Sequence, residues 1–104
     1  VNYEVKRKGQ ASVLTLGEQS YDIVTIGDKD VFKNTNAVID TFMFQFADIR
    51  AEIERREGLT LFCYETLDDY ERGAKKLLEH KTYSVEAMQF LELLTVLKNS
   101  VEMD

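Results

Sequence analysis

The sequence predicts an α+β fold in which a meander of short strands precedes a group of helices. Residues 2–28 contain three strand-like segments separated by glycine-containing turns, which is typical of antiparallel hairpins. Residues 37–58 and 85–99 instead carry apolar side chains at helical spacing. Because strands are grouped before helices, the pattern favours α+β over an alternating parallel sheet. We expect the order β-β-β-α-β-α-α in one domain, residues 1–104.

The three expected strands are delimited by dipeptides that combine glycine with a polar residue. These are Gly9-Gln10, Gly17-Glu18 and Gly27-Asp28. The third segment has apolar side chains at both odd and even positions, so we expect it to be covered on both faces. The polar stretch 28–36 that follows is predicted to be a connection rather than a strand.

Residues 37–58 are predicted to form one long amphipathic helix. The preceding connection offers three residues able to cap its first turn: Asn34, Thr35 and Asn36. Apolar residues recur at spacings of three and four, which places them on a single stripe: Ile39, Phe42, Phe46, Ile49 and Ile53. Gly58 stands where a left-handed C-terminal cap is expected. We therefore expect the stripe to be buried and the helix to end at Gly58.

The C-terminal part is predicted to contain a fourth strand and two more helices. Residues 59–65 are short, β-prone and apolar on both faces, which is typical of a covered strand. Residues 66–81 follow as a helix with Thr66 as its cap, and Ser84 caps the helix of residues 85–99. That last helix has almost no polar face, so its own domain or a partner chain must enclose it.

The charge balance disfavours general binding to nucleic acids. The chain has 19 acidic and 13 basic side chains, a net charge of −6. One basic stretch, Lys6-Arg7-Lys8, could still contact nucleic acid, although a solvated hairpin tip is the simpler interpretation. Nucleic-acid-linked regulation through this tip, or through acidic mimicry, is therefore kept as an alternative.

The cysteine count indicates a reducing compartment, and the hydropathy indicates no membrane span. Cys63 is the single cysteine, so no internal disulfide is possible. The sequence also has no apolar run near the ~20 residues that a membrane span needs, and no apolar stretch of a signal peptide at residues 1–9. We expect a cytoplasmic protein without a membrane anchor.

Catalytic and metal-binding signatures are weak. A Cys63–His80 pair is conceivable, but cysteine in an apolar strand usually behaves as a small inert side chain. An acidic cluster, Glu65, Asp68, Asp69 and Glu71, resembles ordinary charges at a helix N-terminus more than a metal site. The sequence has none of the common nucleotide, hydrolase or zinc motifs. We expect no cofactor and no metal, and a small hydrolase is the least favoured alternative.

One aromatic ring occupies a position where a solvated helix would carry a charge. Phe44 lies about 180° from the apolar stripe of residues 37–58, with Met43 on its flank and Ala47 on its side. We predict that these three residues form a contact surface, helped by Phe90 and Leu97 of the last helix. The alternatives are a second core layer over Phe44, a lone exposed ring without a role, or a helix whose phase differs from the one assumed. The sequence thus predicts a small acidic protein-binding or regulatory module, more plausibly a homodimer than an enzyme.

Overall fold

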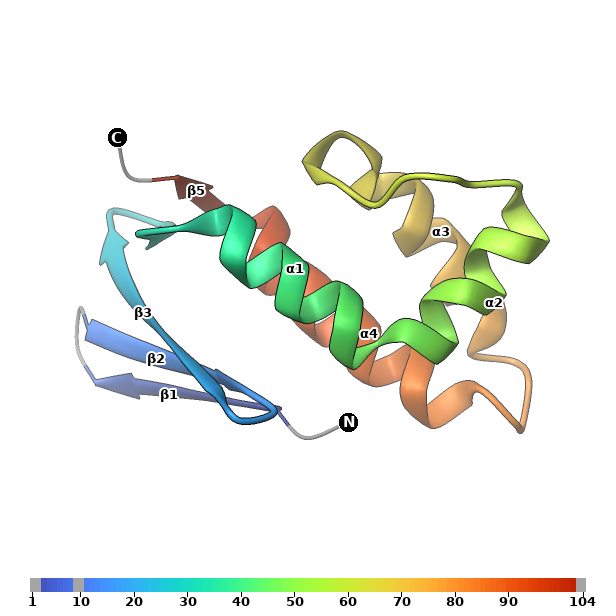
Figure 1. The fold of residues 1–104 in the computed structure, drawn as a ribbon. Coiled ribbons are helices and arrows are strands. Elements are labelled where there is room, and N and C mark those ends of the chain that lie inside the picture. The colour runs from blue at the N-terminus through green and yellow to red at the C-terminus, as the bar shows by residue number, and fades with distance from the viewer. Residues whose placement is uncertain (1–2, 9–10, 103–104) are drawn as a thin grey trace. The chain divides into compact units, whose positions relative to one another are not determined.

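The chain has the predicted α+β class, with a sheet followed by helices (Figure 1). The computed structural model describes residues 3–8 and 11–102, with side chains through Asn99. Two units can be distinguished. The sheet unit holds residues 3–8, 11–45 and 99–102, and the helical unit is Phe46–Lys98. The expected turn at Gly9-Gln10 lies outside the described residues.

The sheet unit contains five strands in the order in which they follow along the chain. Neighbours pair antiparallel from the first strand to the fourth, and the last pair is parallel. Gly17 and Gly27 have φ of 63° and 65°, the left-handed conformation that tight hairpin turns require. The predicted meander is therefore present. The strands are β1 Tyr3–Lys8, β2 Ala11–Leu16, β3 Gln19–Ile26, β4 Lys29–Phe32 and β5 Ser100–Glu102.

The fourth strand lies elsewhere than the sequence pattern indicated. It is β4, within the stretch 28–36 that was predicted to be a connection. Its polar residue Asp30 is buried, but the Arg7 side chain and the Thr25 hydroxyl both donate hydrogen bonds to its carboxylate. The prediction of a strand at residues 59–65 was wrong. That segment is irregular and ends in the 3₁₀ turn η1, Tyr64–Thr66, where the Cys63 amide donates to the Thr66 hydroxyl at 2.9 Å.

One face of the sheet is covered by helix α1, Thr35–Gln45 (Figure 1). The helix begins at Thr35, two residues before the expected start, and Asn34 is the one of the three expected caps that acts, because the Ala37 amide donates to its side chain at 3.1 Å. Tyr21 on β3 is hydrogen-bonded to Thr41 on α1, which ties the helix to the sheet. Apolar residues that are almost fully buried in this unit include Leu14, Leu16, Ile23, Phe32, Val38 and Phe42.

The predicted long helix is two helices. Phe46 has φ −105° and ψ 27°, outside helical geometry, so α1 ends at Gln45 and α2 occupies Ala47–Glu57. Gly58 caps α2 with a left-handed φ of 68°, as predicted. Phe42, Phe46 and Ile49 are each at most 1% exposed. The apolar stripe thus identified buried residues on both sides of the break.

The helical unit is built by α2, η1, α3 (Leu67–Leu77) and α4 (Ser84–Lys98). Phe90 of α4 packs edge-on against Phe46 and Phe62, with ring centroids 5.7 and 6.2 Å apart. The buried side chains of α4 are Ala87, Phe90, Leu93, Leu94 and Leu97. A large part of the apolar surface of α4 is therefore buried inside the chain. Among the residues that the structure describes, no helix has the length and hydropathy to cross a bilayer.

Candidate protein-interaction site

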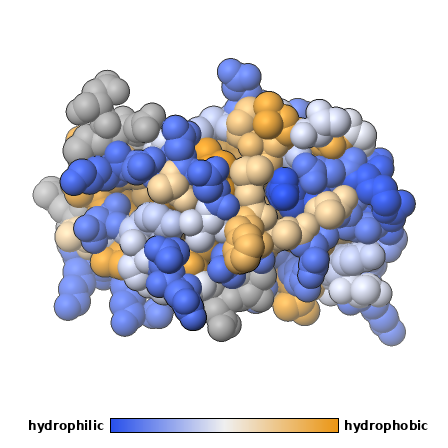
Figure 2. All heavy atoms as spheres, viewed as in Figure 1, coloured by the Kyte–Doolittle hydropathy of each residue, from blue (hydrophilic) through white to orange (hydrophobic). Residues whose placement is uncertain are grey.

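Phe44 is the most exposed large apolar side chain among the described residues, at 79%. The described part of the sheet unit, which carries the ring, therefore forms no second core layer over it. The ring borders an open hollow of about 640 Å³. The hollow is lined by Gly17, Glu18, Gln19, Asp40, Thr41, Phe44 and Gln45. Figure 2 shows exposed apolar side chains among hydrophilic ones over α1.

The position of Phe44 follows from the packing of α1. Val38 and Phe42 point into the unit and are buried, so residues on the other side of the helix, Asp40 and Phe44, face solvent. The end of α1 lies against the β2–β3 turn, where the Gln45 side chain occupies the space that a Cβ at Gly17 would need. The ring is thus carried by a helix that is fixed at both ends, which is the arrangement expected of a preorganised contact residue.

The other residues predicted for the contact surface are distributed differently. Met43 is half-buried beside Phe44 on α1. Ala47 is exposed, but it begins α2 and belongs to the helical unit, because the helix breaks at Phe46. Phe90 and Leu97 are both 0% exposed in the core. These two side chains offer no surface to a partner, so the interface proposed below does not include them.

A second apolar surface, which the sequence reasoning missed, lies on the sheet face opposite α1. Register places Lys6, Val13 and Asp22 in one row across three strands, and Lys8, Ala11 and Val24 in the next row. Together these six residues, which we call the sheet hollow, line most of a depression of about 440 Å³. Val24 is 40% exposed and Ile26 on the same face is 62% exposed. The available signal was the alternation in β3, which we interpreted as coverage of both faces.

The basic stretch at residues 6–8 is not a uniform solvated tip. All three residues lie on β1, where successive side chains alternate between faces. Arg7 forms a two-pronged ion pair with Asp30, with both N–O distances at 3.1 Å. Its hydrogen bonds hold the pKa of Asp30 below the usual carboxyl value. Only Lys6 and Lys8 therefore remain on the opposite, exposed face.

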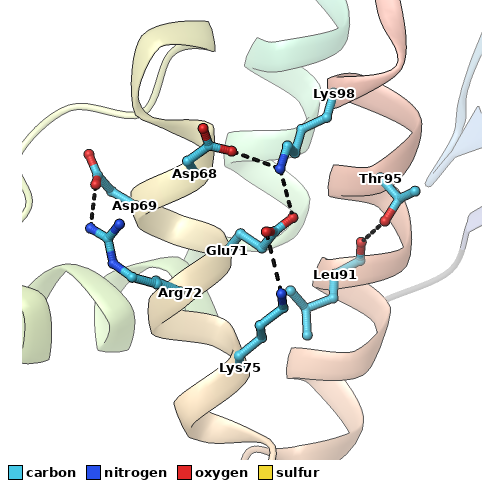
Figure 3. Close-up of polar contacts among 8 residues, drawn as sticks. All are labelled: Asp68, Asp69, Glu71, Arg72, Lys75, Leu91, Thr95 and Lys98. Carbon is cyan, nitrogen blue, oxygen red and sulfur yellow. Dashed lines mark hydrogen bonds and ion pairs between the residues drawn. The ribbon is translucent and has the colours of Figure 1, made fainter.

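The acidic cluster on α3 is largely neutralised by cations (Figure 3). Lys98 of α4 lies 2.7 Å from Asp68 and 3.1 Å from Glu71, and Glu71 also accepts from Lys75. Asp69 pairs with Arg72 on its own helix, while Glu65 is exposed in η1. The Lys98 ammonium lowers the pKa of Asp68 through its hydrogen bond and its charge. No group of three metal-ligating side chains occurs among the described residues.

Cys63 and His80 stand at opposite ends of α3. Cys63 is half-buried directly before η1, and His80 is exposed in the turn after α3. Because α3 has 11 residues, it spans roughly 16 Å, well beyond hydrogen-bond reach. The chain therefore does not bring together the thiol and the imidazole that nucleophilic catalysis would need.

No protein-family model, no curated protein and no solved structure matches this chain.

Proposed function

We propose that this protein works by binding another protein through the Phe44 surface, defined as Phe44 and Met43 with Glu18 and Asp40 beside them. The observation that carries the proposal is a 79% exposed phenylalanine on an anchored helix, next to an open hollow. An exposed ring of this size is unfavourable in water, and its burial by a partner removes an area of about 150–250 Å² from solvent. Rings in such positions often anchor interfaces.

The charges around the ring indicate the chemistry of the partner. Glu18 and Asp40 line the same hollow and are both exposed, and the whole chain has a net charge of −6. A partner with an apolar pocket and basic residues at its rim would match both features. The opposite charges would also accelerate encounter, and they would make the association rate sensitive to salt.

A capture experiment tests this proposal. The tagged parent, Phe44→Asp and Leu61→Asp are compared for the proteins they retain from the native host. Leu61 is a matched control, since it is also a large apolar side chain, 62% exposed, but lies in the helical unit. We expect Phe44→Asp to lose a partner that the other two proteins retain. If Phe44→Asp, still folded, retained every partner of the parent, the proposal would be refuted.

The alternative of a nucleic-acid contact has less support. Of the three basic residues at positions 6–8, Arg7 is engaged by Asp30 on one face of the sheet. Lys6 and Lys8 share the other face with the acidic residues Glu4 and Asp22. Two lysines beside two carboxylates form a poor match for a phosphate backbone, which favours clustered positive charge.

A further inference from the structure

We propose that the partner of the Phe44 surface is a second copy of this chain, which receives the ring in the sheet hollow. This inference rests on the proposed function, because it names the partner of the same ring. Both surfaces belong to the sheet unit, so a single copy carries a projecting ring and a depression on one compact unit.

The two surfaces match in shape and polarity. Phe44 projects from α1 and is 79% exposed, while Val24 on the sheet hollow is 40% exposed. The floor of the hollow consists of the small or β-branched side chains Ala11, Val13 and Val24. Its volume of about 440 Å³ is within the range of pockets that enclose apolar groups. An apolar ring and an apolar floor that are both exposed gain free energy by covering each other.

The charges at the edges are complementary as well. The Phe44 surface has the acidic residues Glu18 and Asp40, whereas the sheet hollow has Lys6 and Lys8 along β1. Two acidic residues share this face: Asp22 lies on β3, across Val13 from Lys6, and Glu4 lies on β1, two residues before Lys6. The incoming acidic residues must therefore lie over Lys6 and Lys8, at the Lys8 end of β1, and away from β3 and Glu4. This requirement restricts the orientation in which the second copy can bind.

The position of the surfaces determines the kind of assembly. Phe44 is on the helix that covers one face of the sheet, and the sheet hollow opens on the other face. A contact between two different surfaces is heterologous and repeats from copy to copy. It produces either a closed circle of subunits or an open filament. One ring and its neighbours cover less than the ~800 Å² per partner of a stable interface. We therefore expect assembly that depends on protein concentration.

The test uses two variants that each disable one side of the contact. Phe44→Asp removes the ring and keeps the sheet hollow. The double variant Lys6→Glu/Lys8→Glu keeps the ring and reverses the charge at the edge of the sheet hollow. Lys33→Glu, an exposed lysine of the sheet unit outside the hollow, is the matched control. Phe44→Gln and Lys6→Gln/Lys8→Gln replace any variant whose melting curve shows that it is unfolded. Mass is measured by sedimentation over a range of concentrations.

We expect the parent and Lys33→Glu to assemble as concentration rises. Phe44→Asp and Lys6→Glu/Lys8→Glu should each be monomeric when measured alone, at concentrations where the parent assembles. The dissociation constant for self-association of Phe44→Asp should be at least about thirtyfold above that of the parent. A mixture of the two variants should form a one-to-one pair, because one copy contributes the ring and the other the hollow. This pair cannot grow further. An interface of two identical surfaces would not be rescued by mixing.

Three outcomes would overturn the inference: a parent that is monomeric at every concentration reached, a lysine double variant that assembles like the parent, or a mixture that stays monomeric. The proposed function has a separate criterion. If the parent is monomeric but Phe44→Asp loses a host partner, the function stands and the inference falls. If Phe44→Asp both assembles and captures partners like the parent, both fall.

Discussion

Arg7 and Asp30 form an ion pair that crosses the sheet, from the first strand to the fourth. Both terminal nitrogens of the guanidinium group, Nη1 and Nη2, donate to the carboxylate at 3.1 Å, and the Thr25 hydroxyl adds a third hydrogen bond at 3.3 Å. Asp30 is 4% exposed, so its carboxylate depends on these donors in place of water. The pair therefore joins the edge strand β1 to β4 by side chains, although the two strands are not hydrogen-bonded neighbours.

Replacement of Arg7 by glutamine should destabilise the fold and change its sensitivity to acid. Loss of a hydrogen bond to a charged group costs about 1–3 kcal/mol at neutral pH. The hydrogen bonds from Arg7 lower the pKa of Asp30 in the folded state. The unfolded chain thus binds this proton first as pH falls. The stabilisation of the fold by the Arg7–Asp30 pair is therefore complete above the pKa that Asp30 has in the unfolded chain. It is lost as pH falls through the lower pKa that Asp30 has in the folded protein.

Thermal melts of the parent and Arg7→Gln between neutral and strongly acidic pH would measure this difference. The two melting temperatures should differ most at neutral pH and converge in acid, because protonation of Asp30 removes the same interaction from the parent. Arg72→Gln is a suitable control, since its partner Asp69 is on the same helix and its side chain is 68% exposed. Parallel pH profiles for the parent and Arg7→Gln would contradict the assignment.

Truncation of Phe46 to alanine should cost about 3–5 kcal/mol of unfolding free energy. The ring is 1% exposed and packs edge-on against Phe90, so the truncation leaves a cavity in the helical unit. Denaturant unfolding of Phe46→Ala and Phe44→Ala provides an internal comparison two residues apart. The unfolding free energy of Phe44→Ala should be close to that of the parent, because the Phe44 ring is exposed. Equal losses would contradict the burial of Phe46 and the exposure of Phe44.

Patterns with a strong physical cause were readable in the sequence. The spacing of Phe42, Phe46 and Ile49 identified buried residues, because a helix must hide its apolar stripe. Asn34 and Gly58 act as caps because each offers what a helix end needs, a side-chain acceptor at the start and a left-handed residue at the end. These signals are local, so no knowledge of distant contacts was required.

The errors concern segments whose structure is decided by residues far away in the chain. β4 contains Asp30, whose charge is typical of a polar connection. Asp30 can be buried in a strand because Arg7, 23 residues earlier in the chain, forms an ion pair with it. Residues 59–65 have the composition of a strand but pair with no strand among the described residues, and the Thr66 hydroxyl accepts from the Cys63 amide instead. The sheet hollow was missed for a related reason, because strand register decides that Lys6, Val13 and Asp22 share a row.

Replacement of Lys98 by glutamine should raise the pKa of Asp68 towards its usual value. The hydrogen bond from the Lys98 ammonium, 2.7 Å away, is the main cause of the lowered pKa, and the charge of Lys98 adds to it. A titration of side-chain carboxyl signals by NMR in the parent and Lys98→Gln would measure the shift. Glu52, whose pKa is lowered by Arg56 and Arg55, is the internal control and should not move. An unchanged Asp68 curve would contradict the ion pairs in Figure 3.

Replacement of Gly73 by alanine should destabilise the protein, although alanine is the better helix former. In the interior of a helix this exchange usually gains about 1 kcal/mol. Gly73 is buried in α3, and a Cβ there would lie 2.6 Å from the Cγ2 atom of Ile53 on α2. Overpacking of this kind costs typically about 1–3 kcal/mol. Because both the added methyl and its neighbour are buried, we expect the loss to exceed the gain.

The double variant Gly73→Ala/Ile53→Ala separates the two effects. Ile53→Ala removes the methyl group that the new Cβ would meet, so in this background Gly73→Ala should cost less than in the parent, or stabilise. Residues in direct contact are expected to show such coupling in a double-mutant cycle. Unfolding free energies of the four proteins provide the measurement. If Gly73→Ala alone raised the melting temperature, or if the two changes were additive, α2 and α3 would not be in contact at this point.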